Sequence, residues 1–175
     1  TFELAVMGKG LKSSDASCDQ AILGRLGPWV ELAKQRGVTL SLYHHIWFLC
    51  ERIEDCVRVA AQLDDPALRV TFCGYHWYAV DRTDLRGKLT LAAPWLRLVN
   101  VCGSRPMPVG EKFAGALPAS IEPVGEGDFP LAEFVDGLRA VGYTGPVGFQ
   151  GYKLGGHPPE TLRRSIEAWR VACGG

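Results

Sequence analysis

The sequence has no excess of charge of one sign and no long apolar run. Its 175 residues include 19 Lys and Arg and 19 Asp and Glu, so the formal net charge is zero. Without a basic patch the chain has no footprint for nucleic acid or for an anionic membrane, and we expect neither as a partner. No apolar stretch approaches the roughly 20 residues that span a bilayer, and no signal-like segment opens the sequence, which favours a cytoplasmic location.

The sequence also lacks closely paired cysteines. Its six cysteines stand at positions 18, 50, 56, 73, 102 and 173, with no Cys-x-x-Cys pair among them. Disulfide frameworks belong mainly to short secreted proteins, so we expect six reduced thiols. With 47% apolar and 22% charged residues, the composition is that of an ordinary globular protein, and we expect one domain over residues 1–175.

Short apolar runs that end in a polar or sulfur-bearing residue recur along the chain, and segments with helical spacing lie between most of them. The predicted strands cover residues 2–7, 38–43, 69–74, 96–101 and 147–150. Strands of this kind that alternate with amphipathic helices predict an α/β fold with a parallel five-stranded sheet.

Two segments interrupt this pattern. Gly27-Pro28 lies inside the first predicted helix, where proline lacks a donor and clashes with the preceding turn, so this helix should kink or split there. Residues 103–127 are rich in Gly, Pro, Ser and Ala, and form a longer loop than compact domains usually contain. We expect this loop to be a lid or a mobile insertion.

Parallel strands present their carboxyl ends on one rim of the sheet, so the polar residues at or just beyond these ends are candidates for a site. The candidate rim residues are Tyr43, His45, Cys73, His76, Cys102 and Gln150. Neighbouring residues of a strand alternate between its two faces, so only one of His44 and His45 can point toward the rim.

Five segments carry a resemblance to a known family. They are residues 38–45, 70–76, 98–103, 121–129 and 142–150, and the most specific marks are Gly-Glu-Gly-Asp at 125–128 and Gly-Tyr-Thr-Gly at 142–145. Together they resemble the sugar-phosphate isomerase/epimerase family of xylose-isomerase-like TIM barrels. The resemblance implies a partial, half-type TIM barrel with outer helices, whose five parallel strands correspond to strands four to eight. The alternative is an open flavodoxin-like sheet, covered on both faces.

The resemblance also implies a divalent metal, Mg or Mn, held by a glutamate, an aspartate, a histidine and a second glutamate at the ends of the last four strands. Tyr43, Cys73, Cys102 and Gln150 align with these positions, and His76 matches the family's histidine three residues past the aspartate. None of the four is a carboxylate, so proton transfer on a metal-bound sugar has lost its bases and its Lewis acid. We therefore expect no cofactor and no ordinary isomerase activity.

The alternative to a lost metal site is a site with different metal ligands. Cys73, His76, Cys102 and His45 offer the sulfur and imidazole ligands that zinc accepts tetrahedrally. The argument against a zinc site is that buried cysteine often packs simply as a small apolar side chain. Three functions stay open: a non-catalytic, self-associating partial barrel; an active sugar isomerase or epimerase with altered metal ligands; and a small-molecule or zinc-binding module.

The expected macromolecular partner is a second copy of the chain, and a small sugar-like molecule is the other candidate partner. Five strands leave open edges, and the sheet should turn an apolar set toward a barrel core whose other half is absent. Water would contact this patch, which soluble monomers seldom allow, so we expect a homodimer built from the barrel-facing side or the open edges. The residues from which this set should come are Leu40, Leu42, Phe72, Leu98, Val99, Val147 and Phe149.

Overall fold

The computed structural model describes residues 1–108 and 117–175. In these residues five strands form one sheet, and each strand is parallel to its neighbour. The order of the strands in the sheet is their order in the chain, which confirms the predicted parallel sheet. The strands are β1 (Phe2–Leu4), β2 (Leu40–Tyr43), β3 (Leu68–Cys73), β4 (Leu96–Val101) and β5 (Val147–Phe149).

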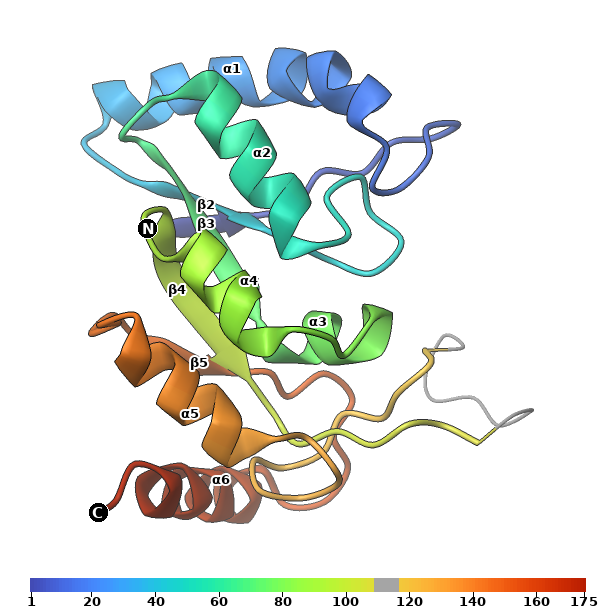
Figure 1. Ribbon diagram of the computed structural model, residues 1–175, viewed down its shortest axis with the longest axis vertical. Helices are drawn as coiled ribbons and strands as arrows, with labels where there is room; N and C mark the ends of the chain where they lie inside the picture. Colours follow the sequence, from blue (N-terminus) through green and yellow to red (C-terminus); the bar gives the residue numbers. More distant parts are fainter. Residues whose placement is uncertain (109–116) are drawn as a thin grey trace.

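The helices follow one another around the outside of the curled sheet, from α1 at one end of the molecule to α6 at the other (Figure 1). This arrangement is a half-barrel, as the family resemblance implies, and it is not an open flavodoxin-like sheet. No helix of the described ranges is long and apolar enough to cross a bilayer. The helices are η1 (Ala16–Cys18), α1 (Asp19–Gln35), α2 (Ile53–Leu63), α3 (Gly74–Val80), α4 (Leu85–Ala92), α5 (Leu131–Ala140) and α6 (Pro158–Ala172).

Sequence periodicity does not predict α3, which begins where β3 ends. Its residues include three aromatic side chains, and aromatic residues favour strands. In the structure Tyr75 donates a hydrogen bond of 3.0 Å to the carbonyl of Ala119, and the indole of Trp77 donates one of 2.9 Å to the carbonyl of Thr83. Burial of these large side chains therefore overrides local propensity.

Of the expected kink or split at Gly27-Pro28, the split is wrong, because α1 continues through Pro28. Pro28 lies on the exposed side of the helix, where the Gly24 carbonyl that loses its intrahelical partner faces solvent. On the opposite side, Ile22, Leu26 and Val30 are buried at helical spacing. Packing of this buried stripe holds the helix together across the proline.

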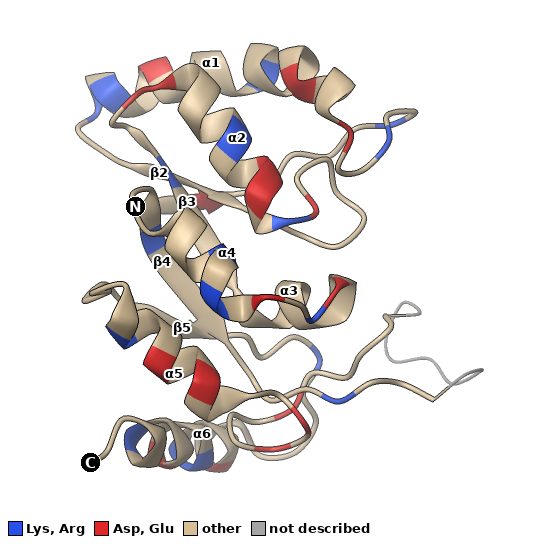
Figure 2. Ribbon diagram, in the orientation of Figure 1, with Lys and Arg blue, Asp and Glu red and all other residues tan. Residues whose placement is uncertain are grey.

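Ion pairs join neighbouring helices on the outside of the half-barrel. Arg58 of α2 donates hydrogen bonds of 2.8 and 3.0 Å to the two carboxylate oxygens of Asp19 in α1. These bonds hold the pKa of Asp19 below its usual value, although burial opposes them. Figure 2 shows basic and acidic residues interspersed along the same helices, in line with the balanced charge of the chain.

The two faces of the sheet differ in chemistry. The outer face is apolar, and the Phe72 ring lies 5.8 Å from the ring of Phe134 in α5. Strand pairing and alternation place Glu3, Ser41, Tyr43, Thr71, Cys73, Leu98 and Asn100 on the inner face. The expected apolar barrel-facing set is therefore wrong except for Leu98. Its other members turn toward the helices: Leu40, Leu42, Phe72, Val99, Val147 and Phe149.

Polar contacts across the inner face show how strongly the sheet curls. Asn100 Nδ2 of β4 donates a hydrogen bond of 2.9 Å to Glu3 Oε1 of β1, although β1 and β4 are not neighbours in the sheet. On the same face the hydroxyl oxygens of Ser41 and Thr71 lie 2.7 Å apart, and both side chains are fully buried. The inner face is therefore partly closed by its own polar side chains.

The long loop contains two paired arms, residues 103–108 and 117–127. Gly103 and Glu122 exchange backbone hydrogen bonds of 2.9 and 2.8 Å, and the amide of Met107 donates one of 3.0 Å to the carbonyl of Pro118. Residues 109–116, which include the tip of the expected lid or mobile insertion, lie outside the described residues. The arms themselves are held together by isolated backbone bridges.

Candidate functional site

A chain of hydrogen bonds joins the ends of β2, β3 and β5 at one rim of the half-barrel. The hydroxyl of Tyr43 donates to Cys73 Sγ at 3.2 Å, and Gln150 Nε2 donates to the hydroxyl oxygen of Tyr43 at 3.4 Å. The curled parallel sheet thus brings three of the candidate rim residues together from distant parts of the sequence. We call the following set the rim site: Tyr43, His45, Cys73, His76, Cys102 and Gln150.

The two thiols and the phenol of the rim site are uncharged at neutral pH. Burial raises the pKa of Cys73 to about 11 and that of Cys102 to about 12. Burial likewise raises the pKa of Tyr43 above its usual value. Cys102 lies 3.6 Å from the hydroxyl oxygen of Ser104, and its side chain has no exposed surface. Removal from water, which disfavours the charged form, is the main physical cause in all three cases.

His44 lies on the helix-covered side and supports the rim from behind. Its Nε2 accepts a hydrogen bond of 2.9 Å from the amide of Cys73. The ring proton must therefore sit on Nδ1, which lies 3.4 Å from the carbonyl oxygen of Glu51 and can donate to it. Burial lowers the pKa of His44 to about 4. The neutral imidazole thus fixes the backbone at the end of β3.

His45 and His76 stack on one another beside Tyr43. Their ring centroids are 4.0 Å apart, and the His76 ring meets the Tyr43 ring edge-on at 5.3 Å. His76 Nδ1 accepts a hydrogen bond of 3.3 Å from the amide of Ile46, so the proton of neutral His76 is on Nε2. Burial lowers the pKa of His76 to about 2 and also lowers that of His45. Two neutral imidazoles therefore complete the rim site.

This donor set does not fit a hard divalent cation such as Mg or Mn, because it contains no carboxylate. Zinc requires thiolates and imidazole lone pairs. Zinc binding here would have to displace the protons of the two buried thiols and of Nε2 of His76. In the described parts of the chain no group of three or more His, Cys, Asp or Glu side chains is arranged to hold a metal ion.

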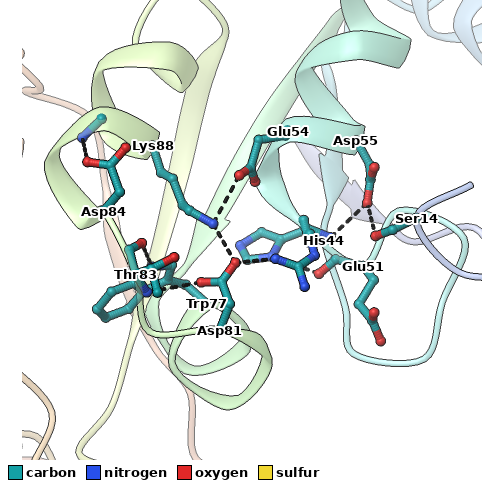
Figure 3. A network of polar contacts seen from close by, with 12 residues as sticks. Ser14, His44, Glu51, Glu54, Asp55, Trp77, Asp81, Thr83, Asp84 and Lys88 are labelled. Carbon is teal, nitrogen blue, oxygen red and sulfur yellow. Dashed lines mark hydrogen bonds and ion pairs between the residues drawn. The ribbon is translucent and has the colours of Figure 1, made fainter. Parts of the chain in front are cut away.

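A charged network lies behind the rim on the helix side (Figure 3), and sequence reasoning missed it. Lys88 of α4 is paired with Glu54 of α2 at 2.9 Å and with Asp81, which also binds Arg52. Burial opposes the charge of Lys88, but its two acidic partners raise its pKa above the usual value. A signal was present in the sequence: Lys88 occupies an apolar position of α4, one residue before the buried Leu89.

A hollow of about 560 Å³ lies outside the rim site, between α3 and the start of α5. The buried side chains of Trp77 and Tyr78 form part of its wall, and Arg82 lies over the Tyr78 ring at 4.6 Å. Asp128 also lines this hollow. Glu126, two residues earlier, is instead paired with Arg164 of α6.

The chain matches a known protein family in sequence and solved proteins in structure. A sequence model of the xylose isomerase-like TIM barrel family matches residues 4–172. No curated protein matches the chain. Among solved structures it is similar to 3-keto-D-glucoside 4-epimerase from E. coli, with a TM-score of 0.73 and 14% sequence identity. The similarity covers 97% of this chain and 63% of that enzyme.

Two further solved structures of similar fold hold metal ions. The IOLI protein with a binding zinc atom has a TM-score of 0.70 and 12% identity, covering 98% of this chain and 61% of that one. A xylose isomerase-like TIM barrel protein from Mycobacterium smegmatis in complex with magnesium has a TM-score of 0.68 and 14% identity, covering 96% and 54%. The chain spans less than two thirds of each of these three proteins.

These low identities establish the fold alone. The family model, in contrast, covers nearly the whole chain, from residue 4 to residue 172. The half-barrel, its parallel strands and its carboxyl-end rim agree with that match. The chain therefore belongs to the xylose isomerase-like TIM barrel family.

Proposed function

We propose that this chain is a partial barrel that does not carry out metal-dependent sugar isomerisation or epimerisation. One observation carries the proposal: Tyr43, Cys73 and Gln150 form a neutral hydrogen-bonded chain at strand ends where the resemblance implies metal-binding carboxylates. Near neutral pH the thiols and the phenol of the rim site keep their protons, and its imidazoles are uncharged.

The chemistry of sugar isomerisation explains why this observation matters. Moving a proton between carbon atoms needs a base whose pKa lies near the working pH, and a metal ion stabilises the oxyanion that develops. The rim thiols have raised pKa values, and the two stacked histidines have lowered ones. His45, which is only half-buried, remains the candidate base for an active isomerase or epimerase with altered ligands.

Binding of a small polar molecule without turnover is the second candidate function. The hollow beside α3 has a volume within the range of small-molecule sites, about 300–1,000 Å³. Arg82 and Asp128 offer a hydrogen-bond donor and an acceptor, while Trp77 and Tyr78, which are 6% and 4% exposed, form its buried wall. This combination favours an uncharged or zwitterionic ligand of sugar size.

Self-association is the other part of the proposal. Among the described residues the half-barrel has two open edges, β1 and β5, because each of these strands pairs with one neighbour there. Unpaired edges and exposed apolar side chains favour association with further protein. Since the inner face is polar over much of its area, an edge is the better candidate for the contact between copies.

Metal analysis tests the proposal. The purified protein is incubated with Mg, Mn or Zn salts, dialysed, and examined by elemental analysis, with a Cys18→Ala variant as a control outside the rim site. We expect no stoichiometric metal. Stoichiometric zinc that is lost in Cys73→Ala and Cys102→Ala but retained in Cys18→Ala would establish the zinc-binding module instead. Stoichiometric Mg or Mn would favour an active isomerase or epimerase.

A further inference from the structure

The hollow of about 560 Å³ beside α3 is basic on one side and acidic on the other. Arg82 and Arg86 line it from the segment that joins α3 to the first turn of α4. Asp128 and Glu133 line it from the segment that leads into α5 and from the first turn of that helix. Since α4 packs against α5, the two pairs of charges meet the hollow from neighbouring helices.

The two arginines and the two acids of this lining are not paired with one another. Within residues 1–108 and 117–175 neither arginine forms an ion pair with an acid, and neither acid forms one with a base. Asp84, a further acid of the lining, is in use, because it accepts a hydrogen bond of 3.1 Å from the amide of Gly87 and caps α4. Opposite charges that stand apart in one hollow suit a ligand that carries both charges.

Arg82 is fixed at the basic side by its own backbone and by two aromatic residues. Its φ is 53°, in the left-handed region that arginine rarely adopts. Its amide donates a hydrogen bond of 3.2 Å to the carbonyl of Trp77, and its Nε donates one of 3.0 Å to the carbonyl of Tyr78. In the part of the chain that the structure describes, its side chain donates through Nε alone. Both Nη groups therefore keep donors for a carboxylate, which arginine binds through two parallel hydrogen bonds.

The acidic side is fixed by the long loop and by α5. The amide of Asp128 donates a hydrogen bond of 2.6 Å to the carbonyl of Ser104 in the other arm of the loop. Glu133 precedes Phe134, which is fully buried and anchors the first turn of α5. Ionised carboxylates accept hydrogen bonds and donate none, so this side selects a donor such as an ammonium group.

We infer that the hollow binds a small zwitterion, a molecule with one carboxylate and one ammonium group, such as a free amino acid. The carboxylate binds Arg82 and Arg86, and the ammonium binds Asp128 and Glu133. This inference rests on the small-molecule binding proposed above as the second candidate function, and it names the ligand class. A neutral sugar in the same place gains the weaker hydrogen bonds of uncharged groups.

Four six-carbon probes test the inference on the 175-residue chain. The probe 6-aminohexanoate carries both charges, hexanoate carries the negative one, hexylamine carries the positive one, and D-glucose carries none. Binding is followed by NMR through the indole N–H signal of Trp77, which lies in the wall of the hollow and donates to the carbonyl of Thr83. We expect 6-aminohexanoate to bind at least about tenfold more tightly than each of the other three, because both of its ends form charge-assisted hydrogen bonds.

Two variants assign the ends of the ligand to the two sides of the hollow. Arg82→Gln should weaken the binding of 6-aminohexanoate and of hexanoate by at least about tenfold and leave hexylamine unchanged. Asp128→Asn should weaken 6-aminohexanoate and hexylamine and leave hexanoate unchanged. The probe that each variant still binds shows that the variant is folded. Arg163→Gln, at an exposed ion pair on α6, is the control and should change none of the four affinities.

The probes also separate failure of the zwitterion from failure of small-molecule binding. D-glucose, hexanoate or hexylamine bound as tightly as 6-aminohexanoate would overturn the zwitterion and keep the hollow as a binding site. Binding of 6-aminohexanoate that is unchanged in both Arg82→Gln and Asp128→Asn would overturn the assigned residues. No shift of the Trp77 signal with any probe would overturn both the zwitterion and binding at the hollow.

Discussion

Gln150, just beyond β5, donates a hydrogen bond of 3.4 Å to the hydroxyl of Tyr43 at the end of β2, from a position 107 residues away in the sequence. Tyr43 in turn donates to Cys73 at 3.2 Å. The three residues occupy strand ends to which the family resemblance assigns metal ligands. In this chain these three bind one another, whereas Nε2 of His76 in the same rim site has no hydrogen-bond partner among the described residues.

Tyr43→Phe removes the hydroxyl that links this chain. The change leaves Gln150 Nε2 without its acceptor and Cys73 Sγ without its donor, so we expect the free energy of unfolding to fall by about 1–2 kcal/mol. Urea denaturation measures this free energy of unfolding. Tyr152→Phe is the matched control, because Tyr152 is 50% exposed and has no hydrogen bond among the described residues. Equal stability of the two variants would show that the rim bonds contribute nothing.

Lys88→Met tests the charged network behind the rim. The Lys88 side chain is 9% exposed and its partner Asp81 is 13% exposed, so the variant leaves a largely buried carboxylate with only Arg52 to pair with it. We expect a loss of about 3 kcal/mol in the free energy of unfolding.

The control for this variant is Arg163→Met. Arg163 and Glu167 form an ion pair of 3.5 Å on α6 with side chains 68% and 69% exposed, and such pairs contribute about 0.5 kcal/mol or less. A Lys88→Met variant as stable as Arg163→Met would contradict the assigned role of the network.

The buried histidines predict acid sensitivity. Burial lowers the pKa of His76 from 6.5 to about 2 and that of His44 from 6.5 to about 4. As the pH falls below 6.5, the unfolded chain takes up protons that the folded protein does not. The free energy of unfolding therefore falls with pH, by about 1.4 kcal/mol per pH unit for each histidine. The stability is complete above pH 6.5 and is lost progressively down to the folded pKa.

His76→Leu should reduce this pH slope by about 1.4 kcal/mol per pH unit, whatever it does to the stability at neutral pH. Denaturation midpoints between about pH 6 and about pH 5 give the slope. Val59→Ala, which removes buried apolar volume but no titrating group, should keep the slope of the wild-type protein. An unchanged slope in His76→Leu would mean that His76 is not held neutral by burial.

Much of the fold follows from the sequence, because short apolar runs that alternate with amphipathic segments specify parallel strands and helices. The sequence does not reveal which side of each strand faces the helices. β2 reads Leu-Ser-Leu-Tyr, yet Ser41 is as deeply buried as Leu42, and only the curl of the sheet explains it. The barrel-facing set was therefore assigned to the wrong side. Likewise, α3 forms because its aromatic side chains are buried by distant segments, and local propensity does not contain that information.

The rim positions were predictable because strand ends of a parallel sheet must converge. Their interactions were not. His44 and His45 are adjacent in sequence, but one accepts a hydrogen bond from the Cys73 amide and the other stacks on His76. The tautomers that make both His44 and His76 acceptors for backbone amides depend on atoms far away in the sequence. The ion pairs of Lys88 could not be predicted for the same reason, since its acidic partners come from α2 and from the segment after α3.

Proton exchange on a sugar is the most direct test of the claim that the rim carries no isomerase chemistry. The protein is incubated in deuterated water with a 3-keto-D-glucoside and, in separate samples, Mg, Mn or Zn salts, and the carbon-bound protons beside the carbonyl are followed by NMR. We expect the same exchange rate as in samples without protein. Faster exchange that requires the metal and is abolished by His45→Ala or Cys73→Ala would contradict this claim.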